Sequence, residues 1–306
     1  MPESQFKTGR AQARTTLAGI GLMLLGVFLF SVNDALGKWL LAVYGVGQML
    51  LIRSIAAMIL ISPLAAREGV AAFKAAPRPG LQVLRVLLST AEIAMFFIAV
   101  SYLPLADTVT FYLAGPIYVT AMSALLLREQ VGWRRWSAVI VGFVGVLIAL
   151  NPSPATLTWP ALIALVGSFF FALLMIVTRH LRGTSDVVLA STQIATTLIF
   201  AAFAAPIGWI TPSTRDILLM SLLGVIAVMA MMSVNRSLKL APASVVVPYQ
   251  YTLIVWAVLL GYFVFGDVPE VHVLVGSAII VAAGLVIFWR EQMTATNPPP
   301  PHVPPP

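Results

Sequence analysis

The sequence predicts an all-α membrane protein, with ten transmembrane helices arranged as two inverted five-helix repeats. Three observations predict this fold: a very apolar composition, ten long apolar segments, and an internal repeat that divides those segments five and five. Of the 306 residues, 60% are hydrophobic and only 9% are charged, whereas soluble domains carry roughly 25% charged residues. This composition, which includes no cysteine, excludes a soluble enzyme, a disordered chain, a coiled coil and a disulfide scaffold.

Ten segments are long enough to cross a hydrocarbon core about 30 Å thick, which takes about 20 apolar residues in a helix. They are apolar on all sides and lack the alternation of a membrane β-barrel. The polar, basic start of the chain does not have the pattern of a signal peptide, so we expect the first segment to be retained. In chain order the segments are Thr16–Leu40, Gly47–Leu64, Leu81–Ser101, Ala106–Leu127, Trp133–Leu150, Trp159–Val177, Val187–Ile207, Ile217–Ser233, Ala243–Phe265 and Val271–Trp289.

The distribution of positive charge orients these segments. Lys and Arg residues concentrate in alternate loops, and cytoplasmic loops are the ones that retain positive charge. Both termini are therefore predicted to be cytoplasmic, and the net charge of +7 marks orientation rather than a nucleic-acid partner. The cations on the predicted cytoplasmic side are Lys7, Arg10, Arg14, Arg67, Lys74, Arg78, Arg85, Arg128, Arg134, Arg135, Arg179, Arg182, Arg236, Lys239 and Arg290.

The chain repeats itself at an offset of roughly 136 to 141 residues. Gly26–Phe30 matches Gly167–Phe171, and Leu105–Val109 matches Ala241–Val245. Each half holds an odd number of spans, so the second copy must enter the membrane from the opposite side, as in many secondary transporters. The predicted organisation is a cytoplasmic segment at 1–15, a first repeat at 16–150, a second repeat at 159–290 and a proline-rich, disordered cytoplasmic tail at 291–306.

Each half carries a set of landmark residues in the same order. In the first half these are Phe96–Val109, Gly115-Pro116, Leu127–Glu129 and Gly142–Gly145. In the second half they are Leu240–Val245, Pro248, Gly266-Asp267 and the stretch from Gly276 to Gly284. Through these residues both halves resemble the EamA domain of the drug/metabolite transporter superfamily. The sequence departs from the family at Asp267, where Glu is commoner, and at Asp107, where a small residue is common. The resemblance implies a ten-helix inner-membrane carrier with both termini cytoplasmic.

Ionisable residues inside spans are candidates for a transport site, because each costs about 2.5 to 3.5 kcal/mol on insertion. Asp34 lies near Asn33 in the first span and has an apolar counterpart, Met175, in the second repeat. Either Asp34 serves transport or it forms a structural ion pair with Lys38, one turn later. Lys38 itself is expected mainly to pair or to extend toward the headgroups. Arg53, in the second span, would bind an anionic substrate group or neutralise Asp34.

Two further acids lie in the first repeat. Glu92, in the middle of the third span, is the leading candidate for proton coupling, with Asp34 as the second. The alternative for Glu92 is a neutral acid hydrogen-bonded to the backbone. Asp107 starts the fourth span, where a carboxylate favours the helix dipole, so a capping role is expected. Arg85 is expected only to anchor a helix end. Asn235 and Arg236 would gate the cytoplasmic mouth or anchor a loop.

Proline and aromatic residues at equivalent places in the two repeats predict the centre of the cavity. Tyr112 and Pro116 lie on the fourth span, and Pro248, Tyr249 and Gln250 lie on the ninth. Proline bends a membrane helix and frees a carbonyl, which protein or water must then satisfy. The tyrosines offer hydrogen bonds and flat faces for a ring-bearing solute. The alternative is that the aromatic residues form an interfacial belt.

The predicted function is secondary transport of a small polar or aromatic metabolite by alternating access, with or without proton coupling. No catalytic, metal or cofactor motif is present, and no nucleotide-binding loop would supply energy. Besides the substrate and the lipid bilayer we expect no partner, and a monomer or weak dimer. The resemblance implies a riboflavin-like vitamin, S-adenosylmethionine or an amino acid as candidate substrates. The alternative is a membrane-embedded lipid-modifying enzyme, and a passive channel is disfavoured.

Overall fold

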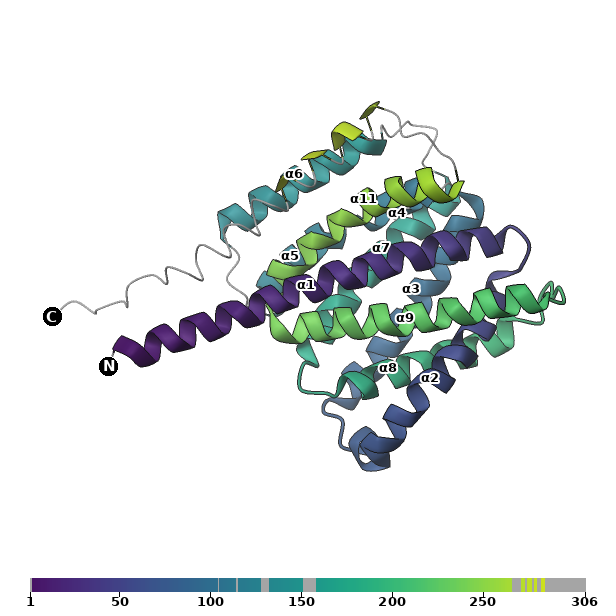
Figure 1. Cartoon of the computed structure of the whole chain (residues 1–306), viewed down its shortest axis with the longest axis horizontal. Coiled ribbons are helices and arrows are strands. Elements are labelled where there is room, and N and C mark those ends of the chain that lie inside the picture. Colours follow the sequence, from purple (N-terminus) through teal and green to yellow (C-terminus); the bar gives the residue numbers. More distant parts are fainter. Residues whose placement is uncertain are drawn as a thin grey trace.

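The computed structural model describes residues 2–103, 105–113, 115–127, 132–150 and 158–265, together with 271–272, 274–276, 278–279 and 282–283. Every regular element in these residues is helical (Figure 1). The longer helices are α1 (Pro2–Leu41), α2 (Val46–Lys74), α3 (Pro79–Tyr102), α6 (Trp133–Leu150), α7 (Trp159–His180), α8 (Asp186–Ala204) and α9 (Thr214–Leu240). The all-α prediction is confirmed for the part of the chain that the structure describes.

Seven helices within the described residues are long and apolar enough to cross a membrane. They match the first, second, third, sixth, seventh, eighth and ninth expected spans, and the first of them is the Arg14–Leu41 part of α1. The expected fifth span is α6, with 18 residues, and most of the tenth, Val271–Trp289, lies outside the described residues. The count of ten therefore stays a prediction.

Two of the expected spans are broken into shorter helices. The fourth consists of α4 (Leu105–Tyr112) and α5 (Gly115–Leu126). The ninth consists of α10 (Ala243–Val246), the 3₁₀ helix η2 (Val247–Thr252), α11 (Leu253–Leu260) and the π-helical turn η3 (Gly261–Phe265). Both breaks lie close to the prolines that predicted them, because a proline removes a backbone donor from the helix interior.

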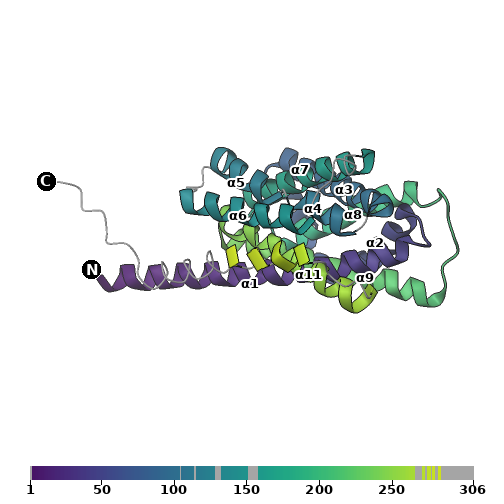
Figure 2. The same cartoon turned by 90° about the horizontal axis from the view of Figure 1, so that it is seen from above.

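The long helices pack in antiparallel pairs across the molecule: α1 against α9, α2 against α8 and α3 against α7. Figure 2 shows α1, α9 and α11 on one side and α3, α5 and α7 on the other. Glycines allow the closest approaches. A Cβ on Gly224 of α9 would collide with the backbone oxygen of Arg53, and one on Gly167 of α7 would collide with the Tyr112 hydroxyl. Small residues at such crossings let membrane helices approach closely.

The outer faces of the helices carry large apolar side chains. Ile59, Leu125 and Phe203, for example, are 68%, 79% and 80% exposed. Water would not favour so much exposed apolar surface, but acyl chains would. Polar and charged side chains instead collect between the helices, so the chain is arranged as a multi-pass membrane protein around a polar interior.

Candidate functional site

A cavity of about 150 Å³ lies between the two sides of the molecule. One buried water needs about 10 to 15 Å³ of such a volume, so the cavity has room for on the order of ten waters. Four ionisable residues, from α1, α2 and α3, line it: Asp34, Arg53, Arg85 and Glu92. Its polar lining is completed by Asn33, Ser54, Tyr112, Thr178, Gln193, Thr197, Asn235 and Gln250. Asp34, Arg53 and Glu92, three of the ionisable residues of the predicted spans, therefore face one shared interior space.

Arg53 is one of the two cations that line this cavity. Its side chain is 7% exposed, and its charge interacts with those of Asp34 and Glu92. Neither carboxylate meets the 4.0 Å limit of a direct ion pair with Arg53. The guanidinium lies 5.6 Å from the centre of the Phe97 ring, which is within cation–π range. Arg53 therefore balances the two acids through space and is not tied to either of them.

Four buried polar atoms on cavity-lining side chains have no hydrogen-bond partner among the described residues. They are Arg53 Nη1, Gln193 Oε1, Asn235 Nδ2 and Gln250 Oε1. Buried polar groups are almost always hydrogen-bonded, and the exceptions call for an explanation such as a bound ligand or water. The set contains both donors and acceptors, so it suits a solute that carries both.

Aromatic rings form one wall of the cavity. Phe96 packs edge-on against Tyr112, with ring centres 5.1 Å apart, and Phe171 lies 6.1 Å from the same tyrosine ring. The Tyr112 hydroxyl donates to the backbone oxygen of Glu92 at 3.2 Å, and Gly167 leaves space for it. A rigid aromatic wall beside buried charges suits a molecule with a planar ring and a charged end.

The remaining expected site residues are placed as follows. Asn33 lines the cavity and donates through Nδ2 to the Leu223 oxygen at 2.9 Å. Gln250 lines the cavity, whereas the adjacent Pro248 and Tyr249 are buried outside its lining. Lys38 donates to the Leu103 oxygen at 3.1 Å, at the far end of α3. Pro116 and Asp107 lie in α5 and α4, and their side chains are outside the described residues.

Arg85 was expected only to anchor a helix end, but it also lines the cavity, and it is 1% exposed. It donates to Thr178 Oγ1 at 3.0 Å, to the Leu189 oxygen at 2.9 Å and to Asn235 Oδ1 at 3.2 Å. The residues that the sequence did not identify as cavity lining are therefore Arg85 and the neutral side chains around it.

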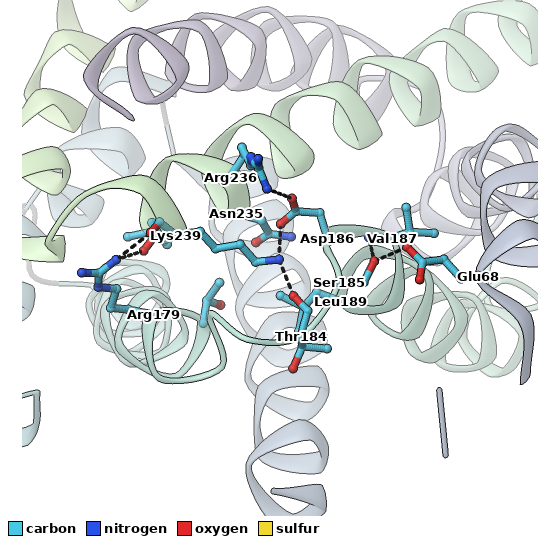
Figure 3. A network of polar contacts seen from close by, with 12 residues as sticks. Glu68, Arg179, Thr184, Ser185, Asp186, Val187, Leu189, Asn235, Arg236 and Lys239 are labelled. Atoms are coloured by element: carbon cyan, nitrogen blue, oxygen red, sulfur yellow. Dashed lines mark hydrogen bonds and ion pairs between the residues drawn. The ribbon is translucent and has the colours of Figure 1, made fainter. Parts of the chain in front are cut away.

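A polar network joins the helix ends beside Leu189 and Asn235, two hydrogen-bond partners of Arg85 (Figure 3). Lys239 lies 2.8 Å from Asp186, and Arg236 lies 3.6 Å from the same carboxylate. Ser185 caps α8 by accepting from the Val187 N–H at 3.2 Å, and it donates to Glu68. The network thus ties the start of α8 to the end of α9 and to the C-terminal part of α2.

A second set of contacts joins the loops at the other end. The Tyr44 hydroxyl donates to Asp216 Oδ2 at 2.7 Å, and this bond raises the pKa of Tyr44 above its ordinary value. The phenol therefore stays protonated and keeps its hydrogen bond at neutral pH. Gln48 exchanges two hydrogen bonds with the backbone of Ile210, at 2.6 and 3.0 Å. Each end of the cavity is thus spanned by contacts between helices of the two halves of the sequence.

The comparisons with known proteins explain this arrangement. The sequence profile of the EamA-like transporter family matches residues 17–151 and again residues 158–289. The chain belongs to the EamA-like transporter family. The predicted resemblance is confirmed, with one family domain in each half of the chain.

Named relatives of this family member are transporters. The S-adenosylmethionine uptake transporter of Rickettsia prowazekii is 24% identical over 93% of this chain and 97% of its own length. The riboflavin transporter of Vibrio cholerae is 26% identical over 90% of this chain and 95% of its own length. A solved crystal structure that is 16% identical shares the fold, with a TM-score of 0.74 over 92% of this chain and 98% of the other.

Proposed function

We propose that this EamA-like transporter is a secondary carrier of the bacterial inner membrane that takes up a zwitterionic, ring-bearing metabolite, with S-adenosylmethionine as the leading candidate. The observation that carries the proposal is the cavity in which Asp34, Glu92, Arg53 and Arg85 share one space with an aromatic wall. Charged groups are tolerated at such depth where they face a pathway or a partner. The names of two relatives, both transporters, support small-molecule transport over enzymatic chemistry.

The chemistry of S-adenosylmethionine matches this lining. The molecule has a sulfonium and an ammonium group for the two carboxylates, a carboxylate for an arginine, and an adenine ring for the aromatic wall. Riboflavin is the second candidate, because it offers a larger ring and a neutral polyhydroxyl chain to unpartnered amides such as Gln193 and Gln250. It leaves both arginines without an anionic partner, so we rank it below the zwitterion.

Alternating access between two inverted five-helix repeats, with ten spans in all and both termini cytoplasmic, is the proposed mechanism. Its support is the pairing of the helices. Exchange of the two halves replaces α1 by α7 and α9 by α3, so the pair α1–α9 becomes the pair α7–α3, and both pairs pack. The α2–α8 pair is exchanged with itself. Such symmetry allows the two ends of a midplane site to open in turn.

A proton on Glu92 or Asp34 is the proposed coupling ion. Both side chains face the cavity and share the field of one arginine. Neutralisation of either acid would change the balance of charge around Arg53 and therefore the affinity of the site for a cationic group. A proton gradient could then drive accumulation of the substrate.

Uptake by purified protein in proteoliposomes tests the proposal. Radiolabelled S-adenosylmethionine should enter with saturable kinetics, and excess riboflavin should compete weakly. The Ala227→Phe variant fills the cavity, since Ala227 lines it, and should abolish uptake. Ala202→Phe, on the exposed face of α8, is the matched control and should transport normally. Uptake of riboflavin alone would favour the second candidate, and uptake unaffected by Ala227→Phe would contradict the site.

A further inference from the structure

Arg85 is a buried cation whose hydrogen-bond partners in the protein are all neutral. Its three donated bonds end on a threonine hydroxyl, a backbone carbonyl and an asparagine oxygen. Among the described residues, no carboxylate lies within the 4.0 Å limit of an ion pair with it. Asp186 interacts with it only through space and is engaged by Lys239 and Arg236. Burial of a guanidinium without an anionic partner costs free energy, so the position of Arg85 calls for an explanation such as an anionic ligand.

Further hydrogen-bond donors remain at this position. A guanidinium has five N–H donors, and Arg85 uses one on each of its three nitrogens. Asn235 accepts from Arg85 through Oδ1, while its own Nδ2 is buried without a partner. Both side chains line the cavity. A positive charge beside spare N–H donors is the arrangement that binds a carboxylate.

This position is separated from the acids of the cavity. Arg85 and Glu92 are seven residues apart on α3, which is about 10 Å along a helix. Thr178, Leu189 and Asn235 all lie near the ends of their helices that face the polar network of Figure 3. The cavity therefore has a carboxylate-rich part around Asp34 and Glu92 and a cationic part around Arg85.

We infer that Arg85 and Asn235 form a carboxylate-binding subsite at the cytoplasmic end of the transport cavity. The inference rests on the proposed function and narrows it to substrates with a carboxylate at one end and a cationic group at the other. In S-adenosylmethionine the α-carboxylate binds at Arg85, while the cationic groups lie toward Asp34 and Glu92. The subsite distinguishes such a zwitterion from a neutral or purely cationic analogue of similar size.

Transport of S-adenosylmethionine and of its decarboxylated analogue by the full-length protein in proteoliposomes tests the inference. The wild-type protein should prefer the carboxylated compound about tenfold or more in apparent affinity, the scale of a charge-assisted hydrogen bond. Arg85→Gln should remove this preference, because the affinity for the carboxylated compound falls by about tenfold or more and that for the decarboxylated compound falls much less. Asn235→Asp should do the same with Arg85 still in place, because the new carboxylate neutralises the guanidinium and removes the spare amide donor.

Arg182→Gln is the matched control. It removes an exposed cation that is not part of the cavity lining and should keep the preference. If Arg85→Gln does not fold, Asn235→Asp decides. Equal affinity of the wild-type protein for both compounds, or an equal loss for both in the variants, would overturn the subsite, the latter because a scaffold role affects every substrate alike.

The experiments distinguish a failure of the proposed function from a failure of the carboxylate subsite. If the wild-type protein takes up neither compound, the proposed substrate is wrong, and thermal stabilisation by acetate then decides the subsite. Stabilisation of the wild-type protein that disappears in Asn235→Asp supports a carboxylate site. Absence of stabilisation by acetate in the wild-type protein rejects it.

Discussion

At the scale of residues, charged side chains in the interior line the cavity, where a solute could bind them. Neither Asp34 nor Glu92 lies within the ion-pair limit of Arg53, although the charge of Arg53 interacts with both of them. In a purely structural cluster the charged groups would form direct ion pairs. A charge that stays buried and unpaired costs on the order of several kcal/mol of folding free energy. The open arrangement is better suited to exchange of a proton or of a charged substrate group.

The Glu92→Gln variant tests the coupling role. An amide keeps the size of the side chain but cannot exchange a proton, so accumulation driven by a proton gradient should be abolished while exchange of substrate continues. Transport assays in proteoliposomes with and without the gradient measure both activities. Glu68→Gln, in the exposed C-terminal part of α2, is the matched control. Gradient-driven accumulation that persists in Glu92→Gln would remove Glu92 from the coupling role.

Single residues were predictable from the sequence where they broke a strong rule. Asp34, Arg53 and Glu92 stood out because each lies well inside an apolar span. Arg85 did not, because it is only six residues after the start of α3 and resembles the cations of the loops. Asn235 was expected only to gate the cytoplasmic mouth or to anchor a loop, and Gln193 carries no charge that sets it apart from the other polar residues of a span. Their role becomes visible only when the helices that carry them meet.

At the scale of elements, close helix crossings and helix breaks shape the cavity. Gly224 brings α9 onto the backbone of α2 at Arg53, and Gly167 brings α7 onto Tyr112. The prolines predicted that the ninth span is irregular, but not that η2 is a 3₁₀ helix. Because neighbouring residues of a 3₁₀ helix point about a third of a turn apart, Gln250 lines the cavity while Tyr249 does not.

Substitution of Gly224 by alanine tests the crossing of α2 and α9. Its Cβ would overlap the backbone of α2, and overpacking of this kind costs about 1 to 3 kcal/mol. Thermal unfolding of the detergent-purified protein should therefore begin at a lower temperature. Gly21→Ala is the matched control, since a Cβ on Gly21 meets nothing within 4 Å. Equal unfolding temperatures for the two variants would show that the crossing is not tight.

At the scale of the whole molecule, two family domains in one chain produce a pairing of helices that is unchanged when the halves are exchanged. The sequence could predict the repeat, because landmark residues recur in order. The orientation, which rests on the alternation of loop cations, stays a prediction. It could not predict which helices meet, because each span is apolar on every side and carries no face that selects a neighbour. That information arises from packing across the halves.

The orientation has a direct test because the chain has no cysteine, so a single introduced thiol is the only one that a maleimide can label. Gly183, between α7 and α8, and Thr211, between α8 and α9, are both exposed. In intact cells an impermeant maleimide should label the Thr211→Cys variant at once, but Gly183→Cys only after permeabilisation. The cysteine-free parent is the control, and the reverse pattern would invert the proposed topology.

The most direct test of the central claim, a carrier with one site that opens to each side in turn, is counterflow. Proteoliposomes preloaded with unlabelled S-adenosylmethionine are diluted into a trace of labelled compound, without a proton gradient. A carrier should accumulate the label transiently above the external concentration, because unlabelled substrate leaving the vesicles returns the site to the outside. Label that only equilibrates, at a rate linear in concentration, would contradict the account and indicate a channel.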